Sequence, residues 1–261
     1  MAREKGPAGF ERYYQEIFGD RWPGLKASLL SSKHTAAYET GLTQPYYLDS
    51  ASVEVAQLLP VAGARRVLDL CAAPGGKALV VASRMEGEAQ LTANERSRRR
   101  RARLLSVLDA HLPPEVRSRV SVTGHDAAQW GIHQPESWDA VLADVPCSSE
   151  QHVLQDPAEL ANWSHSRIKR LAVQQGAILA AAVDSLRAGG HALYVTCALT
   201  PEENDAVVRK VLTKRGPAVE LAQLPSLPGA EPTEFGLQIL PDHAQGTGPL
   251  YCTLVRKRVP G

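Results

Sequence analysis

Short apolar runs alternate with longer amphipathic stretches from about residue 65 onward, and this alternation restricts the fold more than any other feature of the chain. The sequence predicts strands at residues 65–71, 90–94, 120–123, 138–144, 191–196, near 219 and at 250–255. Helices are expected between them, the longest over 164–186 and the last opening at Pro201 and ending near residue 214. Strands that alternate with helices form a mostly parallel sheet with helices on both faces. We therefore expect an α/β protein.

A glycine-rich turn follows the first predicted strand, in the sequence LDLCAAPGGK from Leu68 to Lys77. Such a turn lets a ligand approach the backbone, and the helix that follows favours an anionic group. Glu95 ends the second strand about 20 residues further on, where an acid can hold the ribose hydroxyls of an adenine-type cofactor. Asp126, just beyond the third strand, can meet the adenine amino group or simply stabilise a turn. The pattern indicates a cofactor site.

Two cysteines follow the ends of neighbouring predicted strands. Cys147 lies in DVPCSS after the fourth strand, and Cys197 lies in YVTCALTPEEN after the fifth. Ligands of doubly wound sheets bind outside these strand ends, so both thiols are expected to face one pocket beside the cofactor turn. Two buried structural thiols are the alternative interpretation. With Cys71 and Cys252 the chain has four cysteines and no C-x-x-C pair, which argues against a zinc site or a disulfide scaffold.

Paired thiols suit the methylation of a cytosine ring. Carbon 5 of cytosine is a poor nucleophile, and a thiolate that adds to carbon 6 converts the ring into an enamine that can take a methyl group. Asp144 can bind the ring nitrogen and amino group and stabilise the charge that develops. Lys77 can lower a thiol pKa from its usual value of about 8.5. A base must then remove the proton of carbon 5.

Together these motifs resemble the Sun/RsmB-type family of RNA cytosine-C5 methyltransferases. The resemblance implies a Rossmann-like class I methyltransferase with a mostly parallel, seven-stranded sheet, S-adenosylmethionine as cofactor and 5-methylcytosine in RNA as product. It makes Cys197 the nucleophile and Cys147 the thiol that assists product release, with Asp144 and Lys77 completing the catalytic set. The implied cofactor contacts are Cys71, Ala72, Ala73, Pro74, Gly75, Gly76, Lys77, Glu95, Arg100, Asp126, Ala127 and Asp144.

Some positions depart from the family pattern. Glu95 stands where many relatives have Asp, and Val195 and Ala198 flank the Thr-Cys pair where Ser is commoner. The stretches FGDRWPGLKASLLSSKHTAAYET and DVPCSSEQHVL are similar to the short branch of the family that includes mitochondrial rRNA methyltransferases. We expect rRNA to be favoured over tRNA as substrate. The long N-terminal extension and the appended RNA-binding domain of many members are not found, so a helper protein or a ribosomal particle is expected to assist recognition.

We expect an N-terminal helical extension, residues 1–45, that packs on a methyltransferase domain, residues 46–261. Its net charge is only +1, but six arginines fall between residues 96 and 103. Such a run is either a solvated helix face or a surface that neutralises RNA phosphates. No apolar run is long enough for a membrane span or a leader peptide. A monomeric, cytoplasmic protein without a metal ion is expected.

Four alternatives stay open at this stage. A DNA cytosine-C5 methyltransferase would use Cys147 as nucleophile and would need a target-recognition domain for which there is no room. A small-molecule methyltransferase would not need two thiols. Methylation of tRNA instead of rRNA is the third. A catalytically weak RNA-binding assembly factor is the fourth, and degraded motifs would be its sign.

Overall fold

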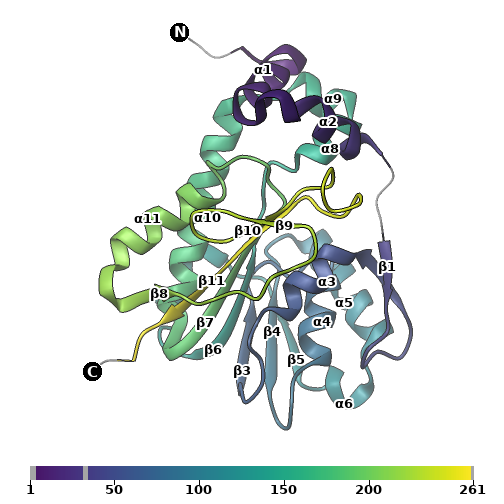
Figure 1. The fold of residues 1–261 in the computed structure, drawn as a ribbon. Helices are drawn as coiled ribbons and strands as arrows, with labels where there is room; N and C mark the ends of the chain where they lie inside the picture. The colour runs from purple at the N-terminus through teal and green to yellow at the C-terminus, as the bar shows by residue number, and fades with distance from the viewer. Residues whose placement is uncertain (1–3, 32–34, 260–261) are drawn as a thin grey trace.

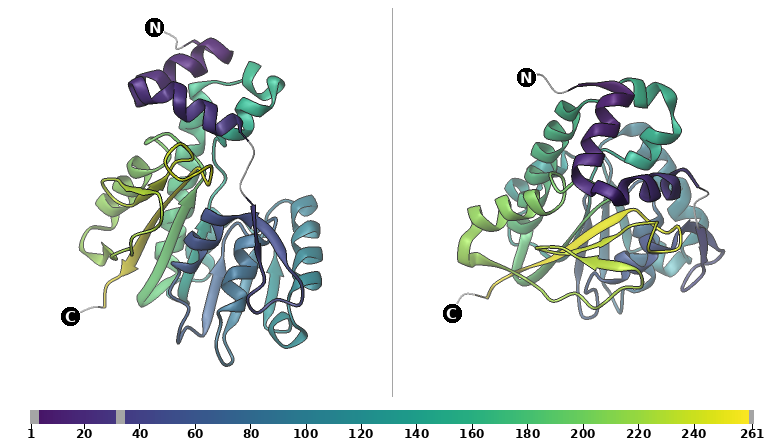
Figure 2. Two further views of the ribbon diagram at one scale, coloured as in Figure 1. Left: turned by 45° about the vertical axis from the view of Figure 1, so that its right-hand side comes forward. Right: turned by 45° about the horizontal axis from the view of Figure 1, so that its top comes forward.

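The computed structural model describes residues 4–31 and 35–259. A central twisted sheet carries helices on both faces, and the N-terminal helices sit over one end of the molecule (Figures 1 and 2). Residues 1–3, 32–34, 260 and 261 lie outside the described residues, and the predicted segment 1–45 therefore falls partly outside them.

The central sheet has nine strands within the described residues. They run in the order β5–β4–β3–β6–β7–β11–β10–β9, and β8 pairs with β11. The strands from β5 to β7 are parallel, whereas the pairings of β7, β8 and β10 with β11, and of β9 with β10, are antiparallel. The bounds are β3 (Arg66–Asp69), β4 (Gln90–Asn94), β5 (Val120–Thr123), β6 (Trp138–Asp144), β7 (Leu186–Thr196), β8 (Val219–Leu221), β9 (Ala230–Pro232), β10 (Leu237–Ile239) and β11 (Leu250–Lys257).

The expected α/β class is confirmed, but the predicted number of seven strands is wrong. The two strands that the sequence did not indicate are β9 and β10, which pair with each other beside β11. Each has only three residues and carries a polar side chain at its centre, Glu231 or Gln238. Segments that are this short and this polar give no hydrophobic period, so pattern reasoning could not find them.

Helices cover both faces of the sheet. The face toward α3, α4 and α5 and the face toward α7, α10 and α11 each enclose a hydrophobic cluster. The helix bounds are α1 (Gly6–Phe18), η1 (Gly19–Arg21), α2 (Trp22–Leu30), α3 (Ser50–Gln57), α4 (Gly76–Ser83), α5 (Arg98–His111), α6 (Pro114–Arg117), η2 (Ala127–Gln129), α7 (Trp130–His133), α8 (Glu150–Gln155), α9 (Pro157–Ala161), α10 (His165–Ser185), α11 (Asp205–Arg215) and η3 (Gly216–Ala218).

Side chains of the central strands alternate between these two clusters. In β6, Ala140 and Leu142 belong to the cluster under α3–α5, and Val141 and Ala143 belong to the cluster under α10 and α11. Successive side chains of a strand point to opposite faces, so a strand covered on both faces must be apolar throughout. This requirement explains the continuous apolar run that the sequence shows at residues 140–143.

The last long helix begins later than predicted, at Asp205 instead of Pro201. The side chain of Asn204 donates to the carbonyl of Ala198 at 2.9 Å and accepts from the Thr196 hydroxyl at 2.6 Å. These bonds hold the chain after β7 as a loop, which competes with a first helical turn. The loop carries Cys197 and therefore belongs to the candidate site.

The N-terminal helices pack through aromatic side chains. Phe10, Tyr14 and Trp22 are buried in a cluster that also contains Trp163 and Leu199. Two further strands, β1 (Thr35–Tyr38) and β2 (Tyr46–Asp49), form an antiparallel pair outside the central sheet, one on each side of residue 45. The proposed domain division at residue 45 stays a prediction.

Candidate active site

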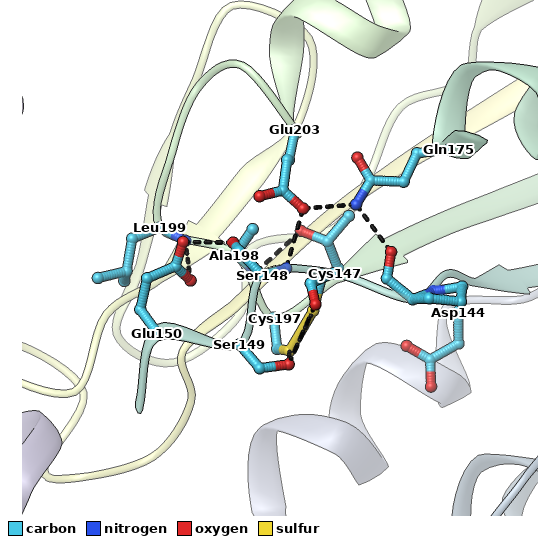
Figure 3. The surroundings of a disulfide bond; sticks show 12 residues. Asp144, Cys147, Ser148, Ser149, Glu150, Gln175, Cys197, Ala198, Leu199 and Glu203 are labelled. Carbon is cyan, nitrogen blue, oxygen red and sulfur yellow. Dashed lines mark hydrogen bonds between the residues drawn. A yellow bond between two sulfur atoms is a disulfide. The ribbon is translucent and has the colours of Figure 1, made fainter. Parts of the chain in front are cut away.

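The loops that leave the carboxyl ends of β6 and β7 bring the two cysteines together. Asp144 and Val195 are partners in neighbouring parallel strands. Cys147 and Cys197 follow these strand ends, and the structure joins their sulfur atoms as a disulfide with a Cα–Cα distance of 6.3 Å (Figure 3). A disulfide holds no thiolate, so any chemistry of these sulfurs requires the reduced pair.

A serine hydroxyl lies against both sulfurs. Ser149 Oγ is 3.4 Å from Cys147 Sγ and 3.3 Å from Cys197 Sγ. Sequence reasoning did not single out this residue, because a serine in a loop gives no distinguishing signal.

Two buried glutamates hold the cysteine loops from behind (Figure 3). Glu203 accepts from the Ser148 amide at 3.0 Å and from the Gln175 side chain at 2.6 Å. Glu150 accepts from the Leu199 amide at 3.2 Å and from the hydroxyls of Ser148 and Tyr14. Burial raises the pKa of Glu203 to about 7, with the charge of Glu150 adding to the effect, and burial likewise raises the pKa of Glu150.

These glutamates were missed by the sequence analysis. Each lies close in sequence to a cysteine motif, but an acidic residue in a loop is expected in solvent. Gln175 links Glu203 to the loop that carries Cys147, because its side chain also donates to the carbonyl of Pro146 at 2.8 Å.

Lys77 and Asp144 form an ion pair beside the cysteine loops. Lys77 Nζ is 3.0 Å from Asp144 Oδ2, and both side chains are largely buried. Within the described part of the chain, neither residue makes a hydrogen bond to a cysteine sulfur. Asp69, at the end of β3, lies nearby and was missed by the sequence analysis. Burial raises its pKa to about 8, and the negative charge of Asp144 contributes.

Some of the twelve predicted cofactor residues line a pocket at the ends of β3, β4 and β5, and Ala72, Ala73, Pro74, Gly75, Gly76, Lys77 and Asp144 do not. The residues that line it are Leu70, Cys71, Asn94, Glu95, Arg96, Arg100, Asp126, Ala127, Pro146, Gln174 and Ile178. Five of them were predicted from the sequence. Asn94 was not, although its side chain donates to the carbonyls of Leu70 and His125 at 2.9 and 3.1 Å. It therefore fixes the loops after β3 and β5 to the end of β4.

The two carboxylate oxygens of Glu95 differ in their hydrogen bonding. Oε1 accepts from the Ser97 amide at 2.7 Å, whereas the buried Oε2 makes no hydrogen bond to any residue that the structure describes and lies 3.2 Å from the Arg100 guanidinium. Arg100 also donates to the carbonyl of Ala73 at 2.6 Å, which ties α5 to the glycine-rich turn. A buried acceptor without a hydrogen bond is uncommon and fits a ligand hydroxyl.

The glycine-rich turn, which includes Ala72, Ala73 and Pro74, connects β3 to α4. Gly75 has φ +125, and a Cβ atom there would lie 2.8 Å from Val107. A Cβ at Gly76 would lie 3.0 Å from the Tyr46 ring. Gly75 therefore requires glycine, and a side chain at Gly76 would have to displace the Tyr46 ring slightly. Asp126 caps η2 by accepting from the Ala128 amide at 3.1 Å, and it also receives Arg96 at 3.3 Å.

Some residues of the arginine run bond to other parts of the protein, and others are exposed to solvent. Arg101 donates to the carbonyl of Glu95 at 2.8 Å. Three others are exposed on α5 and make no hydrogen bond or ion pair within residues 4–31 and 35–259. We name this surface the outer arginine face, and it consists of Arg98, Arg99 and Arg103.

The sheet order and the pocket at its strand ends define a class I methyltransferase fold, and solved structures agree. NSun6 from Pyrococcus horikoshii, solved with SFG, matches with a TM-score of 0.69 and 23% identity over 85% of this chain and 55% of that one. An O-methyltransferase from Bacillus cereus in complex with SAH matches with a TM-score of 0.51 and 13% identity over 95% of this chain and 97% of that one.

Sequence comparison assigns the family. Residues 56–255 match the family described as 16S rRNA methyltransferase RsmB/F. Ribosomal RNA small subunit methyltransferase F of Escherichia coli is 38% identical over 204 residues, which cover 75% of this chain and 40% of the relative. The chain belongs to the RsmB/F family, and the predicted resemblance is confirmed. It spans about two fifths of the length of the curated relatives it matches.

The described residues form neither a metal site nor a membrane-spanning helix. Within residues 4–31 and 35–259, no group of three or more His, Cys, Asp and Glu side chains could hold a metal ion. Among the same residues, no helix is long and apolar enough to cross a membrane.

Proposed function

We propose that this protein transfers a methyl group from S-adenosylmethionine to carbon 5 of a cytosine in RNA. The observation that carries the proposal is the contact between the sulfur atoms of Cys147 and Cys197. These cysteines lie beside Asp144 and next to the pocket that Glu95 lines. Covalent activation of a pyrimidine needs one thiolate for addition and a separate group for release, and two adjacent thiols supply both. The family of the chain supports the same reaction.

The pocket residues fit the proposed cofactor. The free Oε2 of Glu95 would accept from a ribose hydroxyl, and the backbone of the glycine-rich turn would hold the methionine part at the start of α4. Asp126 and Ala127 would lie beside the adenine ring. When bound, S-adenosylmethionine supplies an electrophilic methyl group on sulfur.

The residues at the cysteine loops would then act on the cytosine. The thiolate of Cys197 forms a bond to carbon 6, and the electron pair of the ring double bond becomes available at carbon 5. The ring nitrogen takes up a proton as the thiolate adds, which neutralises the negative charge that develops, and Asp144 would accept hydrogen bonds from this N–H and from the cytosine amino group. Lys77, which is paired with Asp144, would orient this carboxylate.

Release needs a different group. After methylation the proton of carbon 5 must leave, its electron pair restores the double bond, and the bond from Cys197 to carbon 6 breaks. Cys147 would assist this step, and the joining of its sulfur to that of Cys197 supports the assignment.

RNA binding is the second part of the proposal. The outer arginine face would neutralise phosphates, since its guanidinium groups are not used within the described protein. The named relative acts on ribosomal RNA of the small subunit, which favours rRNA over tRNA. We further propose a cytoplasmic monomer that recognises its target within a ribosomal particle or with a helper protein.

Opposite phenotypes of the two cysteines test the mechanism. In the presence of a thiol reductant, Cys197→Ala should neither methylate RNA nor form a covalent complex. Cys147→Ala should add to the cytosine and methylate it, and then remain attached, giving a slowly migrating band on a denaturing gel that depends on S-adenosylmethionine. Cys252→Ala is the matched control, because this cysteine is a free, buried thiol in β11.

The results discriminate between the competing mechanisms. An adduct seen only with Cys197→Ala would indicate the arrangement used by DNA methyltransferases. Normal methylation by both variants would show that the thiols are structural and would refute the covalent mechanism.

Bisulfite sequencing of total RNA from cells with and without the gene identifies the substrate. Loss of one protected cytosine in rRNA is the expected result, and loss in tRNA would replace rRNA by tRNA in the proposal. If no cytosine changes while ribosomal assembly is impaired, the protein is an assembly factor on a methyltransferase fold.

A further inference from the structure

Ser149 is the residue that the proposed chemistry leaves unexplained. Its hydroxyl oxygen lies 3.4 Å from Cys147 Sγ and 3.3 Å from Cys197 Sγ, and Figure 3 shows it directly beside the two sulfurs. A hydroxyl has one proton to donate and two lone pairs to accept, so it can serve two thiol groups at once.

The backbone at Ser149 has a conformation that serine rarely adopts. Its φ is +55 and its ψ is 57, in the left-handed region, where glycine is the usual residue. Such a conformation persists only when the surroundings impose it. Here the flanking residues Ser148 and Glu150 are held by bonds to Glu203, Tyr14 and Leu199. A glycine would relieve the backbone but would bring no hydroxyl to the sulfurs.

We propose that the Ser149 hydroxyl bridges the reduced cysteines, accepting a hydrogen bond from the Cys147 thiol and donating one to the Cys197 thiolate. This assignment rests on the proposed function, which makes Cys197 the nucleophile. Loss of one proton to water leaves the thiol pair with a single proton, and the bridge keeps that proton on Cys147. A hydrogen bond to the charged form of an acid favours ionisation, so the bridge lowers the pKa of Cys197.

The charged groups around the cysteines do not perform this task. Lys77 is paired with Asp144 and makes no hydrogen bond to a sulfur within the described residues. Glu150 and Glu203 lie behind the loops, and negative charge there would oppose a thiolate. Among the described residues, Ser149 is therefore a hydrogen-bond donor in a position to stabilise the Cys197 thiolate. Its proton can also go to the carbonyl of Cys147 at 3.4 Å, and a negative charge on Cys197 favours the sulfur as acceptor.

Alkylation of the reduced protein tests the bridge without RNA or cofactor. The rate at which iodoacetamide modifies Cys197 is measured against pH, with peptide mass spectrometry to separate this cysteine from the other three. Ser149→Gly and Ser149→Ala should move the midpoint upward by about one pH unit, the scale of a hydrogen bond to a charged group. Ser148→Ala is the control for disturbance of the loop, because it removes a donor of Glu150 but no bond to a sulfur.

Methylation of RNA under single-turnover conditions gives the second readout. Both Ser149 variants should be roughly 10-fold slower at pH 7 and recover at higher pH, since one pH unit is a tenfold change in thiolate fraction. A purely structural defect would lower the rate equally at all pH values. Ser149→Gly suits the backbone, so its thermal melting should equal or exceed that of the wild type.

The outcomes separate this inference from the proposed function. An unchanged alkylation midpoint in Ser149→Gly overturns the bridge, even if the wild type methylates RNA. A raised midpoint with a wild type that methylates no cytosine overturns the proposed function and leaves the bridge between the thiols supported.

Discussion

Replacing Glu95 by alanine should weaken S-adenosylmethionine binding by about 2 kcal/mol, roughly 30-fold in Kd. Glu95 Oε1 is already bonded to the Ser97 amide, whereas Oε2 makes no hydrogen bond to a described residue and can gain one from the cofactor. A hydrogen bond to a charged group contributes about 1.5–3 kcal/mol. The Arg100 side chain that pairs with Oε2 is half exposed, so this ion pair contributes under about 1 kcal/mol to stability. Its loss therefore changes the expected weakening of cofactor binding little.

Isothermal titration calorimetry with S-adenosylmethionine measures this loss directly. Glu95→Gln keeps an acceptor for the Ser97 amide but loses the charge, so its Kd should rise less, roughly 3- to 10-fold. Glu115→Ala, which changes an exposed acid on α6, is the matched control. If Glu95→Ala binds the cofactor with the affinity of the wild type while remaining folded, Glu95 does not contact the ribose and the pocket has been assigned wrongly.

Three further predictions concern RNA binding and stability. Replacing the three residues of the outer arginine face by glutamine should weaken RNA binding and reduce the slope of log affinity against log salt by about one per lost phosphate contact. An unchanged slope would show that these arginines are solvated and do not contact RNA. The pKa of Asp69 is raised from 3.8 to about 8 in the folded protein, so the free energy of unfolding should fall as the pH rises from about 4 to 8. Urea titrations of Asp69→Asn should show a free energy of unfolding that depends less on pH over this range. Tyr14→Phe removes a hydroxyl that donates to Glu150 and should cost about 1–3 kcal/mol in urea unfolding, whereas Tyr47→Phe, at an exposed ring, should be neutral.

The parts of the fold that could be predicted are those specified by local pattern. The apolar runs at β3, β6 and β7 indicate strands buried on both faces, and the glycine-rich turn indicates a close approach of the backbone. Because parallel strands share one carboxyl edge, the cysteines after β6 and β7 could be placed together before the structure was known. The short polar strands β9 and β10 could not be predicted, since their pairing depends on β11 and not on their own sequence.

Contacts between distant segments account for what sequence reasoning missed in the candidate site. Glu150 and Glu203 are ordinary loop acids in the sequence, and only the fold surrounds them with donors from α1, α10 and the loop after β7. The Ser149 backbone lies in the left-handed region, and its hydroxyl lies beside both sulfurs. No residue pattern in the sequence predicts this backbone conformation for a serine. Arg101 belongs to the arginine run by sequence, yet it is committed to a backbone carbonyl.

The N-terminal helices contribute to the candidate site as well as to the fold. Tyr14 donates to Glu150, which in turn receives the amide of Leu199 in the loop after Cys197. Tyr13 shares a hydrogen bond of 2.6 Å with Thr200 in the same loop. A buried carboxylate without its donors is strongly destabilising, so removal of α1 would disturb both cysteine loops at once. We therefore regard the helices before residue 45 as a support of the thiol pair, even though the cofactor pocket is built entirely from residues that follow them.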